Sequence, residues 1–275
     1  MARRELGINA FVVAILCLLT IITATPFVWM ILTSFKTNAE TMAIPLQFLP
    51  DSFMMDNFVS LFDRFNFQVY YINSVITTIG ITIPQVLVSA LAAYAFARID
   101  FPGKNFIFLM LMMALLVPIH LILVPRFILM MHLGWVNRLI AVIVPSIPSI
   151  FATFFIRQHI MTIPRELDES AHLDGCSHFR IFALIILPLS KSSLAAMSIL
   201  ALVFSWNLLI WPLVALSSMS NFTLPIGIAN FQGQFNVRFN DLMAGATVAV
   251  IPVLVFFLIG QKYFLEGIAT TGLKA

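Results

Sequence analysis

Six long stretches of the chain contain no Asp, Glu, Lys or Arg, and this spacing of charges strongly limits the possible folds. The stretches cover residues 6–35, 65–97, 105–125, 139–156, 192–237 and 242–261. A helix needs roughly 20 mostly apolar residues to cross the hydrocarbon core of a membrane. We therefore expect an all-α integral membrane protein, a single transmembrane domain over residues 1–275 with its core at roughly 69–262. The six transmembrane helices are expected at residues 9–33, 70–97, 105–124, 139–157, 191–214 and 242–262.

Three of these spans need comment. The stretch 192–237 is expected to hold one span, because its second half is rich in Ser, Asn, Gln, Gly and Pro. Such backbone belongs outside the hydrocarbon or in a protein-lined cavity, where its polar groups find partners. The fourth span contains Pro145 and Pro148, so we expect a kink there. The first apolar run is too long for a typical cleaved signal peptide and is expected to remain as a helix.

The distribution of Lys and Arg predicts the orientation of the chain. If both termini are cytoplasmic, ten Lys and Arg residues lie on the cytoplasmic side and five on the other side. Cytoplasmic loops of membrane proteins carry the excess of positive charge, so this orientation is favoured. The same rule explains the net charge of +3 without a nucleic-acid partner. Residues 164–188 then form the longest cytoplasmic connection.

The composition excludes several classes of function. The chain is 61% hydrophobic and 10% charged, which is far from a soluble globular domain. Its five histidines show no spacing typical of metal ligands, and Cys17 and Cys176 are expected to be ordinary thiols. The sequence has no glycine-rich phosphate-binding loop, so any nucleotide must be bound by another chain. We expect neither enzymatic activity nor a metal or cofactor on this chain.

Within the connection 164–188, the pattern predicts a short helix. Pro164 suits the start of a helix, and the acidic residues that follow complement the positive end of its dipole. Leu167 and Ala171 share a face, and Gly175 is expected to end the helix. So short a helix must pack on something, either its own bundle and the membrane interface or a soluble partner. A second helix is expected to lead through Pro188 into the fifth span.

The same connection resembles a family signature. The pattern is Glu-Ala-Ala, three residues, Gly, nine residues, Ile, one residue and Leu-Pro, and Ser170 takes the place of its middle Ala. The matching residues are Glu169, Ala171, Gly175, Ile185, Leu187 and Pro188. The chain therefore resembles the permease subunits of carbohydrate-import ABC transporters of the maltose-transporter type. The segments FVWMILTSFKT, INSVITT, AYAFARIDFPGK and SWNLLIWPL are also similar to that family. The C-terminal YFLEGIATTGLKA is similar as well, although the family tail more often ends in a Gly-Ala-Val-Lys-Gly type sequence.

The resemblance implies a heteromeric importer in a bacterial or archaeal plasma membrane. The implied partners are a second homologous permease, two ABC ATPases that bind ATP and Mg, and an extracytoplasmic solute-binding protein. The helix before Gly175 would be the coupling helix, which docks on one ATPase and passes the movement through Pro188 to the fifth span. The expected ATPase-coupling residues are Glu166, Leu167, Glu169, Ser170, Ala171 and Gly175.

A path for solute needs polar groups inside the bundle. Asn207 beside Trp206 offers hydrogen bonds for hydroxyl groups and a flat apolar face for a sugar ring, and Asn73 is a further candidate. Alternatively, Asn207 bonds a neighbouring helix and Trp206 faces lipid. Arg126 and Arg138, near Trp135, are expected to be interfacial anchors. The loop 34–67 is expected either to be solvated or to meet the delivery protein.

Other functions stay open at this point. An importer subunit for glycerol phosphate, amino acids or polyamines would share the same architecture. A secondary transporter is less favoured, because it is expected to need ionisable groups inside the membrane and the six stretches contain no Asp, Glu, Lys or Arg. An intramembrane enzyme would need converging His, Asp or Glu groups, and His120 stands alone.

Overall fold

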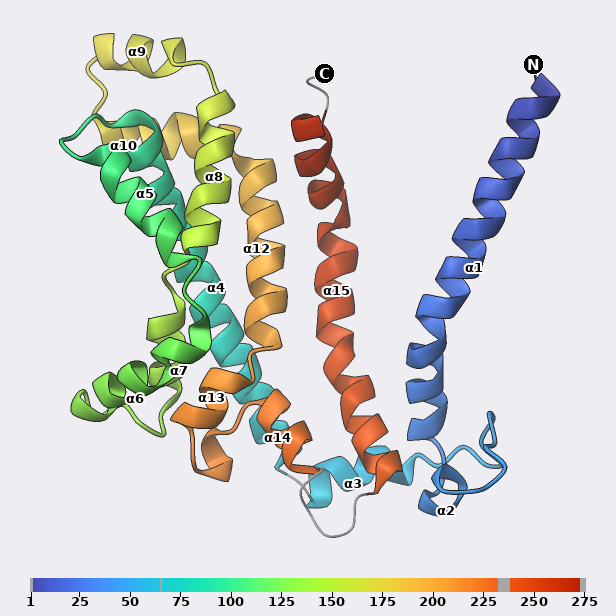
Figure 1. Cartoon of the computed structure of the whole chain (residues 1–275). Coiled ribbons are helices and arrows are strands. Elements are labelled where there is room, and N and C mark those ends of the chain that lie inside the picture. Colours follow the sequence, from blue (N-terminus) through green and yellow to red (C-terminus); the bar gives the residue numbers. More distant parts are fainter. Residues whose placement is uncertain (1, 65, 232–237, 273–275) are drawn as a thin grey trace. The chain divides into compact units, whose positions relative to one another are not determined.

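The computed structural model describes residues 2–64, 66–231 and 238–272, and all regular structure in these residues is helical (Figure 1). The predicted all-α class is therefore confirmed for the described part of the chain. The chain forms two compact units. The first unit contains residues 1–68 and 227–251, and the second contains residues 69–226 and 252–275.

The first unit is built on one long apolar helix. Its elements are α1 (Ala2–Ser34), α2 (Asn38–Thr41), α3 (Asp56–Arg64), the end of α14 (Leu224–Phe231) and the start of α15 (Phe239–Gly272). Within α1, Val12–Ser34 is long and apolar enough to span a membrane, in agreement with the predicted first span. The side chain of Asn57 donates to the carbonyls of Ser34 and Lys36, both at 2.8 Å, and so fixes the start of α3 at the end of α1.

The second unit contains most of the helices. They are α4 (Phe67–Arg98), α5 (Lys104–Ala114), η1 (Ile119–Ile122), α6 (Leu123–His132), α7 (Leu139–Ile143), η2 (Val144–Ser146), α8 (Ile150–Thr162), α9 (Glu166–Leu173), α10 (His178–Ile181), η3 (Phe182–Ile186), α11 (Leu187–Leu189), α12 (Lys191–Trp206), α13 (Ile210–Ala215) and η4 (Met219–Asn221). In Figure 1, α9 lies at one end of this unit and α13 toward the other, and α4 runs between the two ends.

Four helical stretches could each cross a membrane, and two further bent pairs raise the number to six if each pair is one span. The predicted fourth span, 139–157, falls within Leu139–Thr162, which is long and apolar enough to span a membrane. The 3₁₀ turn Val144–Ser146 lies where the proline kink was expected. The predicted third span, 105–124, is wrong as a continuous helix. The helix ends at Ala114, and Lys104–Ala114 makes an angle of 96° with Ile119–His132. Pro118 explains the break, because it disfavours helical backbone at the preceding residue.

The fifth span also differs from the prediction of 191–214. Helix α12 ends at Trp206 and α13 begins at Ile210, so Asn207 caps a helix end and does not lie mid-span. The connection through Pro188 is not straight, because His178–Leu189 and Lys191–Trp206 are bent by 80°. Before the bend, Phe182–Ile186 forms a π-helix. Such turns accommodate local disruption of the α-helical hydrogen bonds, here next to a proline that has no N–H to donate.

Small residues bring the helices of the second unit close together. Ser89, Ala93 and Ala97 of α4 are all buried, and small residues four positions apart allow helices to approach closely. Their core includes Ile156 of α8 and Ala201 of α12. In α15, a Cβ atom added to Gly260 would lie 2.1 Å from Ile199 Cδ1. No larger residue fits there unless Ile199 moves.

The polar half of the stretch 192–237 finds its hydrogen bonds within the protein, as expected for irregular backbone beside a membrane. Asn137, in a left-handed conformation with φ of 59°, accepts from the N–H groups of Ser217 and Ser218 at 3.0 and 2.9 Å. Ser74 Oγ accepts from the N–H of Leu224 at 2.7 Å. Residues 232–237 lie outside the described residues.

Candidate functional site

The short helix α9 agrees closely with its prediction. It runs from Glu166 to Leu173, with three acidic residues in its first turn. Gly175 follows with φ of +80°, a left-handed conformation that favours glycine, so the predicted glycine turn is confirmed. A second helical segment begins at His178. The sequence therefore predicted the local structure of this connection, whereas its coupling role remains a prediction.

A buried ion pair attaches α9 to the end of α4. Arg98 Nε lies 2.7 Å from Asp168 Oδ2, and the two side chains are 5% and 11% exposed. Arg98 also donates to the carbonyl of Ile163 at 2.6 Å. The sequence pattern had indicated Asp168 only as a dipole-complementing charge. Its position three residues before Ala171 is the signal that places both on one face.

Two more arginines hold the last turn of α4. Arg157 Nε donates to the carbonyl of Phe96 at 3.1 Å, and Arg165 Nη2 donates to that of Ala97 at 3.4 Å. Carbonyl groups at a helix C-terminus have no partner within the helix, and cationic side chains satisfy them well. The C-terminus of α4 is therefore fixed by groups from α8 and from the start of α9.

The two faces of α9 have different surroundings. Ala171 is buried in the core of the second unit, so this small residue packs on its own chain. The N–H of Cys176 donates to the Ala171 carbonyl at 2.9 Å and closes the turn. The outward face is exposed, with Leu173 at 90% exposure. The predicted coupling residues Glu166, Leu167, Glu169 and Ser170 are exposed. Leu167 therefore differs in burial from Ala171, although the sequence had placed the two on one face.

Two histidines pack together beside the Gly175 turn. The rings of His172 and His178 lie 4.5 Å apart in an edge-to-face arrangement. His172 Nδ1 is 3.1 Å from the Cys176 carbonyl, and His178 Nδ1 is 3.4 Å from the Tyr94 hydroxyl. No cluster of His, Cys, Asp and Glu suited to a metal is present among the described residues. The two histidines pack against each other and make polar contacts beside the turn.

The predicted path residues do not form one cluster. Trp206 is 4% exposed and its ring meets that of Tyr71 edge-on at 5.5 Å, so it faces neither lipid nor an open path. Asn207 is exposed, and its amide donates to the Val203 carbonyl of its own helix at 2.8 Å. The amide of Asn73 donates to two carbonyls of the loop 216–223, both at 3.0 Å. Asn73 thus fixes a loop, and Asn207 is the most accessible of the three.

Arg126, a predicted interfacial anchor, makes two contacts with other helices. Its guanidinium carbon lies 4.2 Å from the ring centroid of Trp211, and Nη2 donates to Ser146 Oγ at 3.0 Å. The partly buried guanidinium is therefore held by a cation–π contact and a hydrogen bond, and its role as an anchor stays a prediction. Arg138 is exposed and stays available as an anchor.

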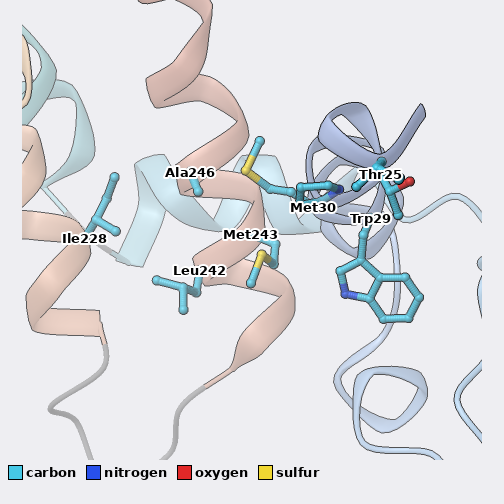
Figure 2. Close-up of a pocket in the computed structure, with 9 residues that line it drawn as sticks. Thr25, Trp29, Met30, Ile228, Leu242, Met243 and Ala246 are labelled. Carbon is cyan, nitrogen blue, oxygen red and sulfur yellow. The ribbon is translucent and has the colours of Figure 1, made fainter. Parts of the chain in front are cut away.

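The first unit holds an apolar recess of about 650 Å³ between α1 and the start of α15 (Figure 2). Trp29 and Met30 line it from α1, and Leu242 and Met243 line it from α15. Thr25 is the one hydroxyl-bearing residue of its lining. A sugar needs several polar groups to pair with its hydroxyls, so this recess does not suit a solute site.

Together, the apolar helices and the short helix fixed at one end of the second unit define an integral membrane protein of the helical type. Residues 64–269 match the model of the binding-protein-dependent transport system inner membrane component family, so the chain belongs to that family of transport subunits.

Individual relatives agree with this assignment. The chain is 39% identical over 252 residues to the arabinooligosaccharides transport system permease protein AraQ of Halalkalibacterium halodurans, with 90% of each protein covered. Among solved structures, a chain of a bacterial ABC transporter involved in import of the acidic polysaccharide alginate has a TM-score of 0.84. It is 19% identical, with 96% of this chain and 98% of that chain covered, which shows a shared fold. A chain of the bacterial alginate transporter in complex with a pentasaccharide-bound periplasmic protein has a TM-score of 0.70, with 15% identity and coverage of 94% and 93%.

Proposed function

We propose that this chain is one of two homologous permease subunits of an ATP-driven importer for a sugar or short oligosaccharide. An extracytoplasmic binding protein delivers the solute, and both termini of the chain lie in the cytoplasm of a bacterial or archaeal cell. Support for a saccharide comes from the similarity to AraQ. The observation that supports the coupling role best is α9, which a buried ion pair holds from one side while its other face stays accessible.

In this proposal the exposed face of α9 docks on an ATPase subunit, which binds ATP and Mg. Leu167 and Leu173 supply the apolar contacts, since they are 41% and 90% exposed. Glu166 and Glu169 supply charge-assisted hydrogen bonds to basic groups of that partner. Ala171 and Asp168 face the other way and hold the helix to its own unit. Gly175 permits the turn that presents this face.

We propose that movement of α9 reaches the bundle chiefly through α4. Arg98, at the end of α4, is paired with Asp168, whereas the route through Pro188 contains an 80° bend. Asn73 lies 25 residues before Arg98, which corresponds to about 38 Å of helix. Asn73 holds the loop 216–223, so a rigid shift of α4 would displace that loop together with α9. Asn207, which is exposed at the end of α12, is the proposed contact for the solute.

The test is to purify the tagged chain with its co-eluting subunits, place them in vesicles, and measure uptake and ATP hydrolysis. Leu173→Glu should abolish co-elution of an ATPase and lower uptake at least tenfold, because it places a charge in an apolar contact. Leu173→Met is the matched control and should keep both. Uptake by this chain alone, with no nucleotide-hydrolysing partner, would contradict the proposal.

The choice of solute has a separate test. Radiolabelled sugars, glycerol phosphate, amino acids and polyamines are offered to the co-purified binding protein. Selective binding of a saccharide supports the proposal, and selective binding of a charged solute overturns its sugar part. Asn207→Ala should then lower uptake several-fold while leaving assembly intact.

A further inference from the structure

The segment Met42–Met55, between α2 and α3, exposes an unusual amount of apolar surface. We name it the apolar loop. Ile44 is 97% exposed, Leu46 73% and Phe53 69%. Met42, Phe48, Leu49 and Met55 are also exposed, and Asp51 is the one charged residue of the segment. Large apolar patches of this kind on a protein surface mark contact with a membrane or a partner.

The apolar loop is a built structure and not a loose tail. At its base, Glu40 accepts hydrogen bonds from the N–H groups of Thr37 and Asp51, at 2.5 and 2.8 Å. The ammonium of Lys36, which is 1% exposed, donates to the carbonyl of Gln47. The backbone of the loop is therefore held by the side chains of Lys36 and Glu40, while its apolar side chains point outward.

Contacts with α1 show the depth at which the loop lies. The ring of Phe48 is 5.3 Å from that of Trp29, and Lys36 Nζ is 4.5 Å from the same indole. Trp29 belongs to Val12–Ser34, the part of α1 that is long and apolar enough to span a membrane, and lies five residues before the helix ends at Ser34. At 1.5 Å per residue, Trp29 lies about 7.5 Å inside the end of that span. Phe48 therefore packs beside the part of α1 that is long and apolar enough to span a membrane.

The far end of the loop is tied to the same boundary. The N–H of Met54 donates to the carbonyl of Phe35 at 2.9 Å, and the rings of Phe35 and Phe53 are 5.5 Å apart. The next long apolar helix, α4, begins at Phe67, so both ends of the connection return to one side of the membrane. These contacts hold both ends of the loop close to the end of α1.

We propose that the apolar loop is a membrane-interface anchor that inserts Ile44, Leu46 and Leu49 into the lipid at the boundary where α1 ends. Asp51 stays at the level of the headgroups. Amphipathic segments bury an apolar face about 5–10 Å into this layer, which matches the depth set by the Phe48–Trp29 contact. A binding protein that docks and then leaves would expose this apolar surface to water in each transport cycle. Because such exposure is unfavourable, the bilayer is the better candidate to cover the loop.

Spin labels measure this placement directly. Ile44→Cys and Leu46→Cys, each in a Cys17→Ala/Cys176→Ala background, are labelled in the complete transporter in nanodiscs of phosphatidylcholine and phosphatidylglycerol. Ser52→Cys is the matched control, since it is exposed in the same loop. Relaxation by oxygen, which concentrates in lipid, is compared with relaxation by a water-soluble nickel chelate. We expect labels at 44 and 46 to favour oxygen at least threefold over the label at 52.

Two results overturn the proposal. Relaxation by nickel at 44 and 46 equal to that at 52 would place the loop in water. Protection from both agents would place it under a protein subunit. If either variant fails to assemble, Leu49→Cys provides the same measurement from the neighbouring exposed position. The result is independent of the solute and of nucleotide hydrolysis, so failure of the proposed transport function would not mimic failure of this proposal.

Discussion

The turn around α9 and the apolar loop are both short connections outside the long apolar helices, yet their side chains are arranged in opposite ways. On α9 the glutamates at 166 and 169 are exposed and the small Ala171 is buried. In the apolar loop the large apolar side chains are exposed, and the cation of Lys36 is buried beneath them. The contrast is in line with the two environments proposed above, an ATPase partner for α9 and lipid for the loop.

Each connection also contains a buried cation, and the two cations have different partners. Arg98 pairs with the carboxylate of Asp168 and ties two helices together. Lys36 finds a backbone carbonyl and an indole face and ties a loop to a single helix. Removing either cation should loosen its own connection and leave the other unchanged, which allows the comparison to be tested.

The largest effect is expected at the ion pair. Arg98→Ala leaves Asp168 buried without its partner, and breaking a buried pair in this way costs about 3–5 kcal/mol. We expect uptake to be lost while the ATPase subunits continue to hydrolyse ATP, with a lower Tm for the purified transporter. The exchange Arg98→Asp with Asp168→Arg should restore part of the uptake. Full uptake by the single variant would refute the proposed route through α4.

A smaller effect is expected at Lys36. Lys36→Met keeps the length of the side chain but removes the hydrogen bond from the ammonium to the Gln47 carbonyl, and a hydrogen bond to a charged group contributes about 1.5–3 kcal/mol. A spin label at position 44 should become more mobile, while ATPase stimulation through α9 stays at the wild-type level. Loss of that stimulation would show that the two connections are not independent.

Gly175 and Gly134 form a matched pair of substitutions. Both have positive φ, +80° and +67°, and a Cβ atom added to either meets nothing within 4 Å. Alanine at either position therefore costs only backbone strain, about 1–2 kcal/mol. We expect similar losses of stability from Gly175→Ala and Gly134→Ala. Only Gly175→Ala should lower the ratio of uptake to ATP hydrolysis, and equal ratios would contradict the coupling role of the turn.

The smallest effect concerns the base of the apolar loop. Hydrogen bonds from the N–H groups of Thr37 and Asp51 lower the pKa of Glu40 below its ordinary value of 4.5. A lowered pKa in the folded state means that this contribution to stability is present above pH 4.5 and is lost as the pH falls through the lowered pKa. Label mobility at position 44 should rise in that acidic range. Glu40→Gln should remove this pH dependence.

The sequence predicted those features that depend on local patterns. Long apolar stretches without charges sufficed for α1, α4 and α15, and the order of Pro164, acidic residues and Gly175 sufficed for α9. The end of the helix at Ala114 was not predicted. A run of apolar residues indicates that a segment prefers a membrane or a protein core, but it does not show whether the helix is continuous. Pro118 was the available signal for that break.

The anchoring contacts could not be read from the sequence. Arg98 and Asp168 are 70 positions apart, and nothing in either local pattern shows that folding brings them together. The same holds for Asn73, whose amide is used by the loop 216–223. A polar residue in an apolar helix is a sound candidate for function, yet whether its groups are already occupied depends on tertiary structure.

The π-helix Phe182–Ile186 gives the segment between Gly175 and α12 one residue more than a regular α-helical turn would hold. Each residue of an α-helix turns the chain by about 100°. Deleting one residue here would therefore rotate everything before it, including the edge-to-face pair His172 and His178, by roughly a quarter turn. The extra residue of this π-helix therefore fixes the rotation of α9 about the helix axis, and with it the direction in which the exposed face of α9 points.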